Sequence, residues 1–168
     1  MKKGESNKLS IALFEPRIPQ NTGNIARTCA AFNIPLHIIE PFGFSLNSKL
    51  LKRAGLDYWP YMDISIHKNM QEFIKTLNNG ERLLGFSKSA SKPLARVDFL
   101  NKDVLIFGRE DTGLPDFVRS KCNQIASIPM PGGVVENESI GVRSLNLANS
   151  VAIVAYQAIL KLDGFNNS

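Results

Sequence analysis

The sequence predicts an α/β fold of one domain, in which a parallel β-sheet is flanked by helices. Short apolar runs alternate with segments of helical period along the chain, and this alternation is typical of βαβ units. The length of 168 residues fits a single domain with its own core. A content of 43% apolar and 21% charged residues, without repeats or low-complexity tracts, is that of an ordinary globular protein.

The first strand and the first helix are predicted from the segment that follows the N-terminus. The apolar run Leu9–Phe14 predicts a short buried strand. Pro16 and Pro19 end it, because proline cannot donate a hydrogen bond to a β-ladder. The polar segment Gln20–Asn24 then starts a helix, whose apolar residues recur at helical spacing as far as Phe32.

The remaining elements follow the same alternation. Further strands are predicted at Leu36–Glu40, Arg82–Phe86, Asp103–Gly108 and Gln124–Pro129, and helices at Leu50–Gly55, Asn69–Leu77 and Ser144–Leu162. Apolar residues cover almost the whole circumference of the last helix. We therefore expect this helix to be buried on more than one side.

Polar residues gather at the carboxyl ends of the predicted strands, where α/β proteins bind ligands. Asn21, Asn24 and Arg27 follow the first strand and are expected to converge at the turn into the helix. The charged loop 109–115 follows the strand at Asp103–Gly108. Taken singly, each segment also fits a plain helix cap or an exposed arginine.

Several function classes lose support from the sequence. No apolar run reaches the roughly 20 residues of a membrane span, and residues 1–8 lead into no signal-peptide core, so we expect a cytoplasmic protein. Cys29 and Cys122 lack metal-ligand spacing, which predicts reduced thiols, buried or half-buried, and no metal site. His37 and His67 lack a sequence partner and are expected to be structural. The net charge of +5 favours a polyanionic partner such as nucleic acid.

Three stretches together resemble one known family. They are Asn21–Arg27, Phe107–Pro115, and Ile128–Met130 taken with Arg143–Asn149. They are similar to the three motifs of the SPOUT RNA ribose methyltransferases. The similarity is greatest to the minimal branch that methylates the 2′-hydroxyl of the tRNA wobble nucleotide in the anticodon loop. It extends from Ile11 to about Leu162.

The resemblance implies a deep trefoil knot at the C-terminal end of the α/β domain and an obligate homodimer. S-adenosylmethionine would be the cofactor, held in the knot, and tRNA the substrate, with neither a membrane nor a metal involved. A partner subunit would supply the second cover that the apolar last helix requires.

The resemblance also assigns site residues. The walls of the cofactor pocket would be the exit of the strand ending at Phe86, together with Gly108, Glu110, Ile128, Met130, Ser144, Leu145 and Asn146. Asn21 and Arg27 would face the ribose as catalytic residues, and Tyr156, like Arg27, would bind the substrate. Because a guanidinium is effectively always protonated, we expect Arg27 to hold a phosphate or to polarise the ribose rather than to act as the base.

One segment departs from the family pattern. The glycine-rich loop 131–142 is longer than the usual link and predicts a mobile flap, while 1–8 and 163–168 are expected to be flexible ends of the single domain 1–168. Two alternatives stay open. The enzyme could act on another tRNA position or on rRNA, or the chain could be a non-catalytic RNA-binding dimer.

Overall fold

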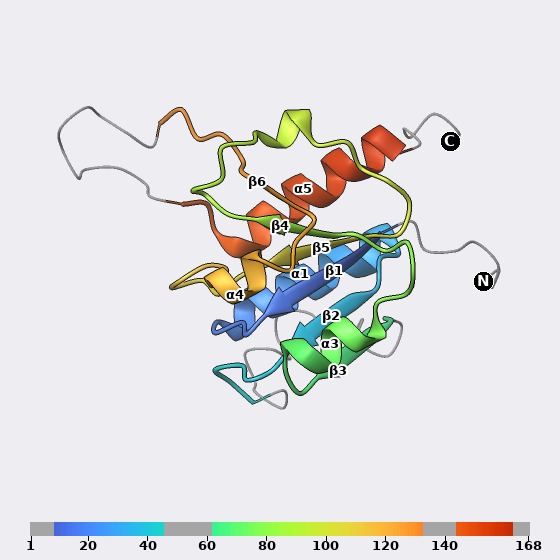
Figure 1. Ribbon diagram of the computed structural model, residues 1–168. Coiled ribbons are helices and arrows are strands. Elements are labelled where there is room, and N and C mark those ends of the chain that lie inside the picture. The colour runs from blue at the N-terminus through green and yellow to red at the C-terminus, as the bar shows by residue number, and fades with distance from the viewer. Residues whose placement is uncertain (1–8, 46–61, 133–143, 163–168) are drawn as a thin grey trace.

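A computed structural model of the protein describes residues 9–45, 62–132 and 144–162 (Figure 1). Six parallel strands form one sheet in the order β3-β2-β1-β5-β4-β6. The strands are β1 (Leu9–Phe14), β2 (Leu36–Ile39), β3 (Ile64–His67), β4 (Leu83–Phe86), β5 (Asp103–Phe107) and β6 (Gln124–Ala126). The helices are α1 (Pro19–Phe32), α3 (Met70–Thr76), α4 (Asp116–Arg119) and α5 (Leu147–Leu162), with a 3₁₀ turn, η2, at Leu94–Arg96. The expected α/β fold with a parallel sheet flanked by helices is confirmed.

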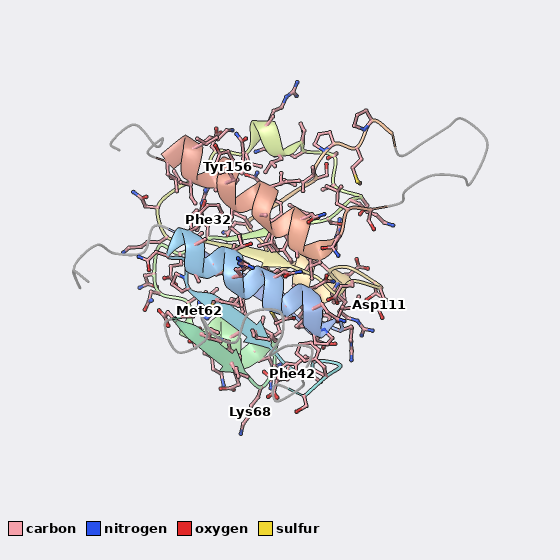
Figure 2. All side chains as sticks on the ribbon, turned by 180° about the vertical axis from the view of Figure 1, so that it is seen from behind. Phe32, Phe42, Met62, Lys68, Asp111 and Tyr156 are labelled. Carbon is pink, nitrogen blue, oxygen red and sulfur yellow. The ribbon has the colours of Figure 1, made fainter. Side chains whose placement is uncertain are left out.

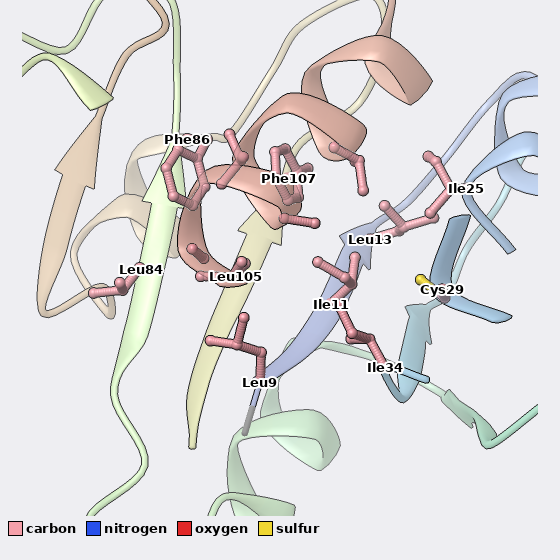
Figure 3. Packing of buried hydrophobic residues seen from close by; sticks show 14 of the residues in the cluster. Leu9, Ile11, Leu13, Ile25, Cys29, Ile34, Leu84, Phe86, Leu105 and Phe107 are labelled. Atoms are coloured by element: carbon pink, nitrogen blue, oxygen red, sulfur yellow. The ribbon is translucent and has the colours of Figure 1, made fainter. Parts of the chain in front are cut away.

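The sheet is covered on both faces, because alternate residues of each strand point to opposite sides. In β1, Ile11 and Leu13 pack in the cluster that contains residues of α1 and α5, as Figure 3 shows for the strand residues and for Ile25 and Cys29. Ala12 and Phe14 pack in the second cluster, with residues of α3 and α4. Burial on both faces explains why the central strands are continuous apolar runs.

The predicted elements agree with the structure except at their ends and in one strand. The helix expected from Ser144 begins at Leu147, and the last strand stops at Ala126. No range was predicted for β3, which contains Ser65 and only two isoleucines. The helix expected at Leu50–Gly55 lies outside the described residues, as does most of the loop 131–142.

His37 and His67, which have no partner at ligand spacing in the sequence, form a pair in the structure. His37 Nδ1 lies 3.0 Å from His67 Nε2. The parallel register of β2 and β3 pairs Ile39 with His67, which brings both imidazoles to the sheet face covered by α3. Both rings also contact Phe73, with centroids 5.5 and 5.2 Å away. Burial lowers the pKa of both histidines, and the neighbouring His67 lowers the pKa of His37 further.

Helices α1 and α5 lie side by side on one face of the sheet (Figure 2). Near their carboxyl ends the rings of Phe32 and Tyr156 approach to 6.5 Å between centroids. The outer side of α5 exposes Ile153, Tyr156 and Leu160, which are 42%, 47% and 39% accessible. One chain therefore leaves an apolar stripe of α5 uncovered.

Two buried or half-buried contacts fix the segment between β4 and β5. Asp103 is 1% exposed and accepts two hydrogen bonds from Arg82, at 2.8 Å from Nε and 2.7 Å from Nη2. Lys161 of α5 donates from Nζ to the carbonyls of Ala95 (2.7 Å) and Val97 (2.8 Å). The Lys161 contacts hold the 3₁₀ turn and the residue after it against the last helix.

The two thiols are unpaired, as expected, with Cys29 buried and Cys122 half-buried. Burial raises the pKa of Cys29 to about 12 and that of Cys122 to about 11, so both are protonated at neutral pH. Within the described ranges, no helix is long and apolar enough to cross a bilayer. The same ranges contain no cluster of three or more His, Cys, Asp or Glu side chains suited to a metal ion.

Candidate functional site

A cavity of about 730 Å³ opens at the carboxyl ends of β4, β5 and β6, beside the turn that follows β1. The strand order reverses direction between β1 and β5, and such a switch point is where open α/β sheets bind ligands. The structure brings all the expected cofactor residues into its wall: Phe86, Gly108, Glu110, Ile128, Met130, Ser144, Leu145 and Asn146. Asn21 lies in the same wall.

The loop after β5 is a tight turn that requires glycine at its start. Arg109 N donates to Gly113 O at 3.2 Å, and Gly113 N donates back to Arg109 O at 2.9 Å. A Cβ on Gly108 would lie 2.1 Å from the Gly113 carbonyl carbon and 2.2 Å from Leu114 N. Because both neighbours are backbone atoms, they cannot rotate away. Gly113 itself has a φ of +72°, a conformation that favours glycine.

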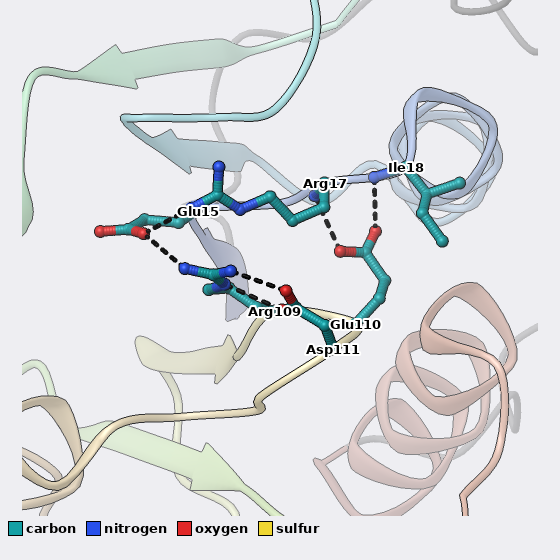
Figure 4. Close-up of polar contacts among 6 residues, drawn as sticks. All are labelled: Glu15, Arg17, Ile18, Arg109, Glu110 and Asp111. Carbon is teal, nitrogen blue, oxygen red and sulfur yellow. Dashed lines mark hydrogen bonds and ion pairs between the residues drawn. The ribbon is translucent and has the colours of Figure 1, made fainter.

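Glu110 joins this loop to the start of α1 (Figure 4). Its carboxylate accepts hydrogen bonds from the backbone N–H groups of Arg17 at 2.7 Å and Ile18 at 3.1 Å. It also accepts one from Asn21 Nδ2 at 3.3 Å. A carboxylate suits this position, since free N–H groups at a helix start favour negative charge.

Asn21 extends the same network to the start of α5. Its Oδ1 accepts a hydrogen bond from Asn146 Nδ2 at 2.9 Å, across 125 residues of sequence. Asn146 Oδ1 in turn accepts from the N–H groups of Ala148 (2.8 Å) and Asn149 (3.3 Å), which makes Asn146 the cap of α5. One chain of side-chain hydrogen bonds thus connects the three motif segments.

Charges beside the cavity compensate one another. Arg109 donates to both oxygens of Asp111, at 2.9 and 2.7 Å, and lies 3.5 Å from Glu15 Oε2 (Figure 4). The guanidinium lowers the pKa of Asp111 to about 2, so this carboxylate is ionised at neutral pH. Arg17 also pairs with Glu15, at 3.2 Å. This network stiffens the rim between the ends of β1 and β5.

Arg27 and Tyr156, which were predicted to bind the substrate, lie outside the cavity wall. Asn21 is 6% exposed, whereas Asn24 and Arg27 are exposed on the outer side of α1. The expected convergence of these three side chains does not occur within one chain. The reason is that α1 already begins at Pro19, so Arg27 is six residues beyond Asn21 and about 240° further round the helix. Tyr156 lies on the exposed stripe of α5.

Ser87, Lys88 and Ser89 line the cavity directly after β4, where the resemblance places the exit of the strand ending at Phe86. Asp116 and Arg119 of α4 also line the cavity, and these two residues were not expected from the sequence. The sequence spacing could have indicated these two residues. Asp116 and Arg119 are three residues apart, and so they share a face of the short helix that follows the motif loop.

The lining suits a ligand with a flat apolar part and a hydroxylated polar part. Phe86, Ile128 and Leu145 provide apolar surface, and the 108–113 turn provides backbone close to the cavity. Asn21, Glu110 and Asn146 supply amide and carboxylate groups for hydroxyls. The cavity thus combines apolar walls with fixed polar groups, and the few polar groups of a cofactor site set how its ligand is oriented.

The sequence is similar to those of known proteins. A sequence model of the SpoU rRNA Methylase family matches residues 8–156. A protein of Lactococcus lactis subsp. cremoris (strain MG1363), provisionally named a tRNA (cytidine(34)-2′-O)-methyltransferase, is 50% identical over 153 residues, covering 89% of this chain and 86% of the relative. The tRNA (cytidine(34)-2′-O)-methyltransferase of Methylovorus glucosotrophus (strain SIP3-4) is 39% identical over 148 residues, covering 88% and 92% of the two chains.

Solved structures of other proteins are similar to this fold. One that describes the 2-OH methylation of C/U34 on tRNA has a TM-score of 0.82 at 44% identity, covering 91% of this chain and 95% of that one. The SpoU methyltransferase AviRb from Streptomyces viridochromogenes, in complex with the cofactor AdoMet, shares the fold at a TM-score of 0.79 and 21% identity, covering 94% and 61%. The family match takes in every described strand, the motif loops and most of α5, and the chain therefore belongs to the SpoU rRNA Methylase family.

Proposed function

We propose that this protein uses S-adenosylmethionine to methylate the 2′-hydroxyl of a tRNA ribose, at the wobble nucleotide of the anticodon loop. The observation that carries the proposal is the single cavity in which the three motif segments meet, tied by the Glu110–Asn21–Asn146 hydrogen bonds. The choice of nucleotide is supported by relatives at 39% and 50% identity whose names specify cytidine 34 of tRNA.

The cavity residues fit S-adenosylmethionine. Phe86, Ile128 and Leu145 would enclose the adenine, and Asn146 and the 108–113 backbone would hold the ribose. When bound, the cofactor supplies a methyl group on a sulfonium, which is already a good leaving group. The protein's own contribution is then mainly to place the RNA hydroxyl in line with that methyl group and to exclude water.

Asn21 and Arg27 would act on the RNA ribose. Asn21 is held between Glu110 and Asn146 and so presents a fixed amide at the cavity. The part of Arg27 is to hold a phosphate or to polarise the ribose, while the 2′-hydroxyl proton passes to a neighbouring group or to water. Arg27 reaches a ribose only where dimerisation or RNA binding brings the ribose to α1, because it lies outside the cavity of its own chain.

The functional form would be a homodimer, joined through the outer sides of α1 and α5. Ile153, Tyr156 and Leu160 form an exposed apolar stripe at helical spacing, and an apolar stripe of this kind is typical of a protein interface. A two-fold dimer lets the same stripe of each copy cover the other. Arg27 and Tyr156 would then both lie at the subunit boundary.

The expected trefoil knot is also part of this proposal. The chain runs from β6 at the edge of the sheet back to α5, which lies beside α1 on the central strands. Lys161 of α5 hydrogen-bonds to Ala95 and Val97 in the segment between β4 and β5. Contact between the last helix and this earlier segment supports passage of the C-terminal end through it.

The test is methylation of total tRNA that lacks the modification, using labelled cofactor, followed by mapping of the labelled nucleotide. Label on the ribose of the wobble nucleotide is the expected result. Label at another tRNA position, or on rRNA alone, would replace the proposed substrate. Cofactor binding without any methyl incorporation would favour the non-catalytic RNA-binding dimer.

A conservative change at Arg27 tests its chemical role. We expect Arg27→Lys to lower kcat by at least about tenfold, because an ammonium cannot reproduce the planar fork of the guanidinium. Steady-state kinetics on tRNA, with Arg96→Lys as an exposed control on η2, measures this. Near-normal kcat with only a raised KM for tRNA would refute a chemical role.

A further inference from the structure

Arg119 is the one cation of the described cavity wall, apart from the exposed Lys88, that has no carboxylate partner. Of the cavity cations, Arg109 is paired with Asp111 and Glu15. Among the described residues, no carboxylate lies within ion-pair distance of Arg119, although Asp116 is on the same short helix. An uncompensated charge in a ligand cavity calls for an explanation.

The surrounding contacts fix Arg119 without neutralising it. Its Nη1 donates to Ser87 Oγ at 2.9 Å and to Ser89 Oγ at 3.3 Å. The two hydroxyls also contact each other at 3.1 Å, and Ser89 N donates to Ser87 Oγ at 3.4 Å, which stabilises the turn after β4. One guanidinium nitrogen is therefore committed to the protein. Nε and Nη2 donate to no described residue, so they are available to a molecule in the cavity.

A guanidinium with Nε and Nη2 available matches the two oxygens of a carboxylate or phosphate. Lys88, exposed on the same turn and lining the same cavity, adds a second positive charge. Glu110, in the same wall, lies at the start of α1 and accepts hydrogen bonds from its backbone N–H groups, so the cavity carries an acidic group as well as the basic Arg119. This arrangement orients a ligand whose ends carry different charges.

We propose that Arg119, positioned by Ser87 and Ser89, binds an oxyanion group in the cavity. The inference rests on the proposed function, in which two molecules bring such a group: the cofactor through the carboxylate of its methionine part, and tRNA through a backbone phosphate. Either source uses the same bidentate contact. Arg119 is thus a ligand-binding residue of this chain that lies outside the three motif stretches.

Calorimetry with two probes separates the sources. S-adenosylhomocysteine carries the carboxylate, whereas 5′-methylthioadenosine lacks the whole amino-acid part. If the carboxylate is bound, Arg119→Gln lowers affinity for S-adenosylhomocysteine by roughly 10- to 100-fold and leaves that for 5′-methylthioadenosine unchanged. If a phosphate is bound, both affinities are unchanged, tRNA binding weakens, and the slope of its salt dependence falls by about one.

Lys121→Gln is the matched control, because it removes the same charge from an exposed side chain two residues away that does not line the cavity. Arg119→Lys, which keeps the charge but not the fork, should recover only part of the loss. Thermal unfolding of each variant checks that the fold is retained.

Unchanged binding of S-adenosylhomocysteine and of tRNA in a folded, active Arg119→Gln protein would overturn the inference while leaving the proposed function intact. A wild-type protein that binds neither small probe would overturn both.

Discussion

At the residue scale, Gly108 shows how little freedom the motif loop has. An added methyl group would meet two backbone atoms, 2.1 and 2.2 Å away, that belong to the same turn. We expect Gly108→Ala to destabilise the fold by about 2 kcal/mol or more, and to abolish S-adenosylhomocysteine binding, because the turn must open. Urea unfolding and calorimetry measure the two effects.

Gly132→Ala is the control, since a Cβ there meets no atom within 4 Å. It should leave both properties unchanged. A stable, ligand-binding Gly108→Ala protein would contradict the backbone constraint described for the 108–113 turn.

The sequence predicted only some of the residues that line the cavity. The expected cofactor residues were brought in by the family resemblance, and they do share one wall. Arg27 and Asn21 were placed together because they are close in sequence, but a helix that starts at Pro19 turns them apart. Arg119 was overlooked because its partners Ser87 and Ser89 lie about 30 residues earlier, and no local pattern encodes that contact.

At the scale of elements, β5 and the segment before it depend on the Arg82–Asp103 pair. Asp103 is 1% exposed, so removing Arg82 leaves a buried carboxylate without a charge partner and with only the hydrogen bond from Leu100 N. Arg82→Met should lower the free energy of unfolding by about 3 kcal/mol in urea titration. Lys75→Met, which breaks the solvent-exposed pair with Glu72 on α3, should have no measurable effect. Equal losses in the two variants would mean that burial does not govern the Arg82 contact.

The contact between β2 and β3 should make stability depend on pH. The folded pKa values of His37 and His67 lie below the usual 6.5, so between that value and the lowered one the unfolded chain binds protons that the folded chain does not. The stabilising contribution is therefore complete above about pH 6.5 and is lost as the pH falls through the folded pKa.

A double variant, His37→Leu with His67→Leu, should show a flatter decline than the wild type between about pH 7.5 and about pH 5.5. Urea unfolding across this interval measures the difference, and Asn78→Leu, which changes an exposed polar residue elsewhere, serves as the control. Parallel curves for the wild type and the double variant would show that the pair carries no proton linkage.

Strand positions were easier to predict than strand partners. The runs at β1, β2, β4 and β5 are buried on both faces, and this requirement shows in the sequence as continuous apolar residues. Edge strand β3 has one buried residue and gave no such signal. The pairing of His37 with His67 depends on the register between β2 and β3, which sequence spacing does not encode.

At the scale of the whole molecule, the proposed dimer predicts a change in mass. Ile153→Lys places a charge on the exposed stripe of α5, where it would be buried in the proposed symmetric interface. We expect this variant to sediment as a monomer in analytical ultracentrifugation. Leu100→Lys changes another exposed apolar residue, 53% accessible and not on α5, and should leave the mass unchanged. A wild-type protein that sediments as a monomer would refute the dimer.

The adjacent placement of α1 and α5 has a consequence for regulation by protein concentration. Both helices begin near the Asn21–Asn146 hydrogen bond, and α5 carries its exposed apolar stripe further along its axis. Because a helix moves as a rigid element, a displacement at the stripe of α5 also displaces its first turn at the cavity. In the proposed dimer, dilution that separates two copies should therefore weaken cofactor binding as well, so that cofactor saturation and self-association are coupled equilibria.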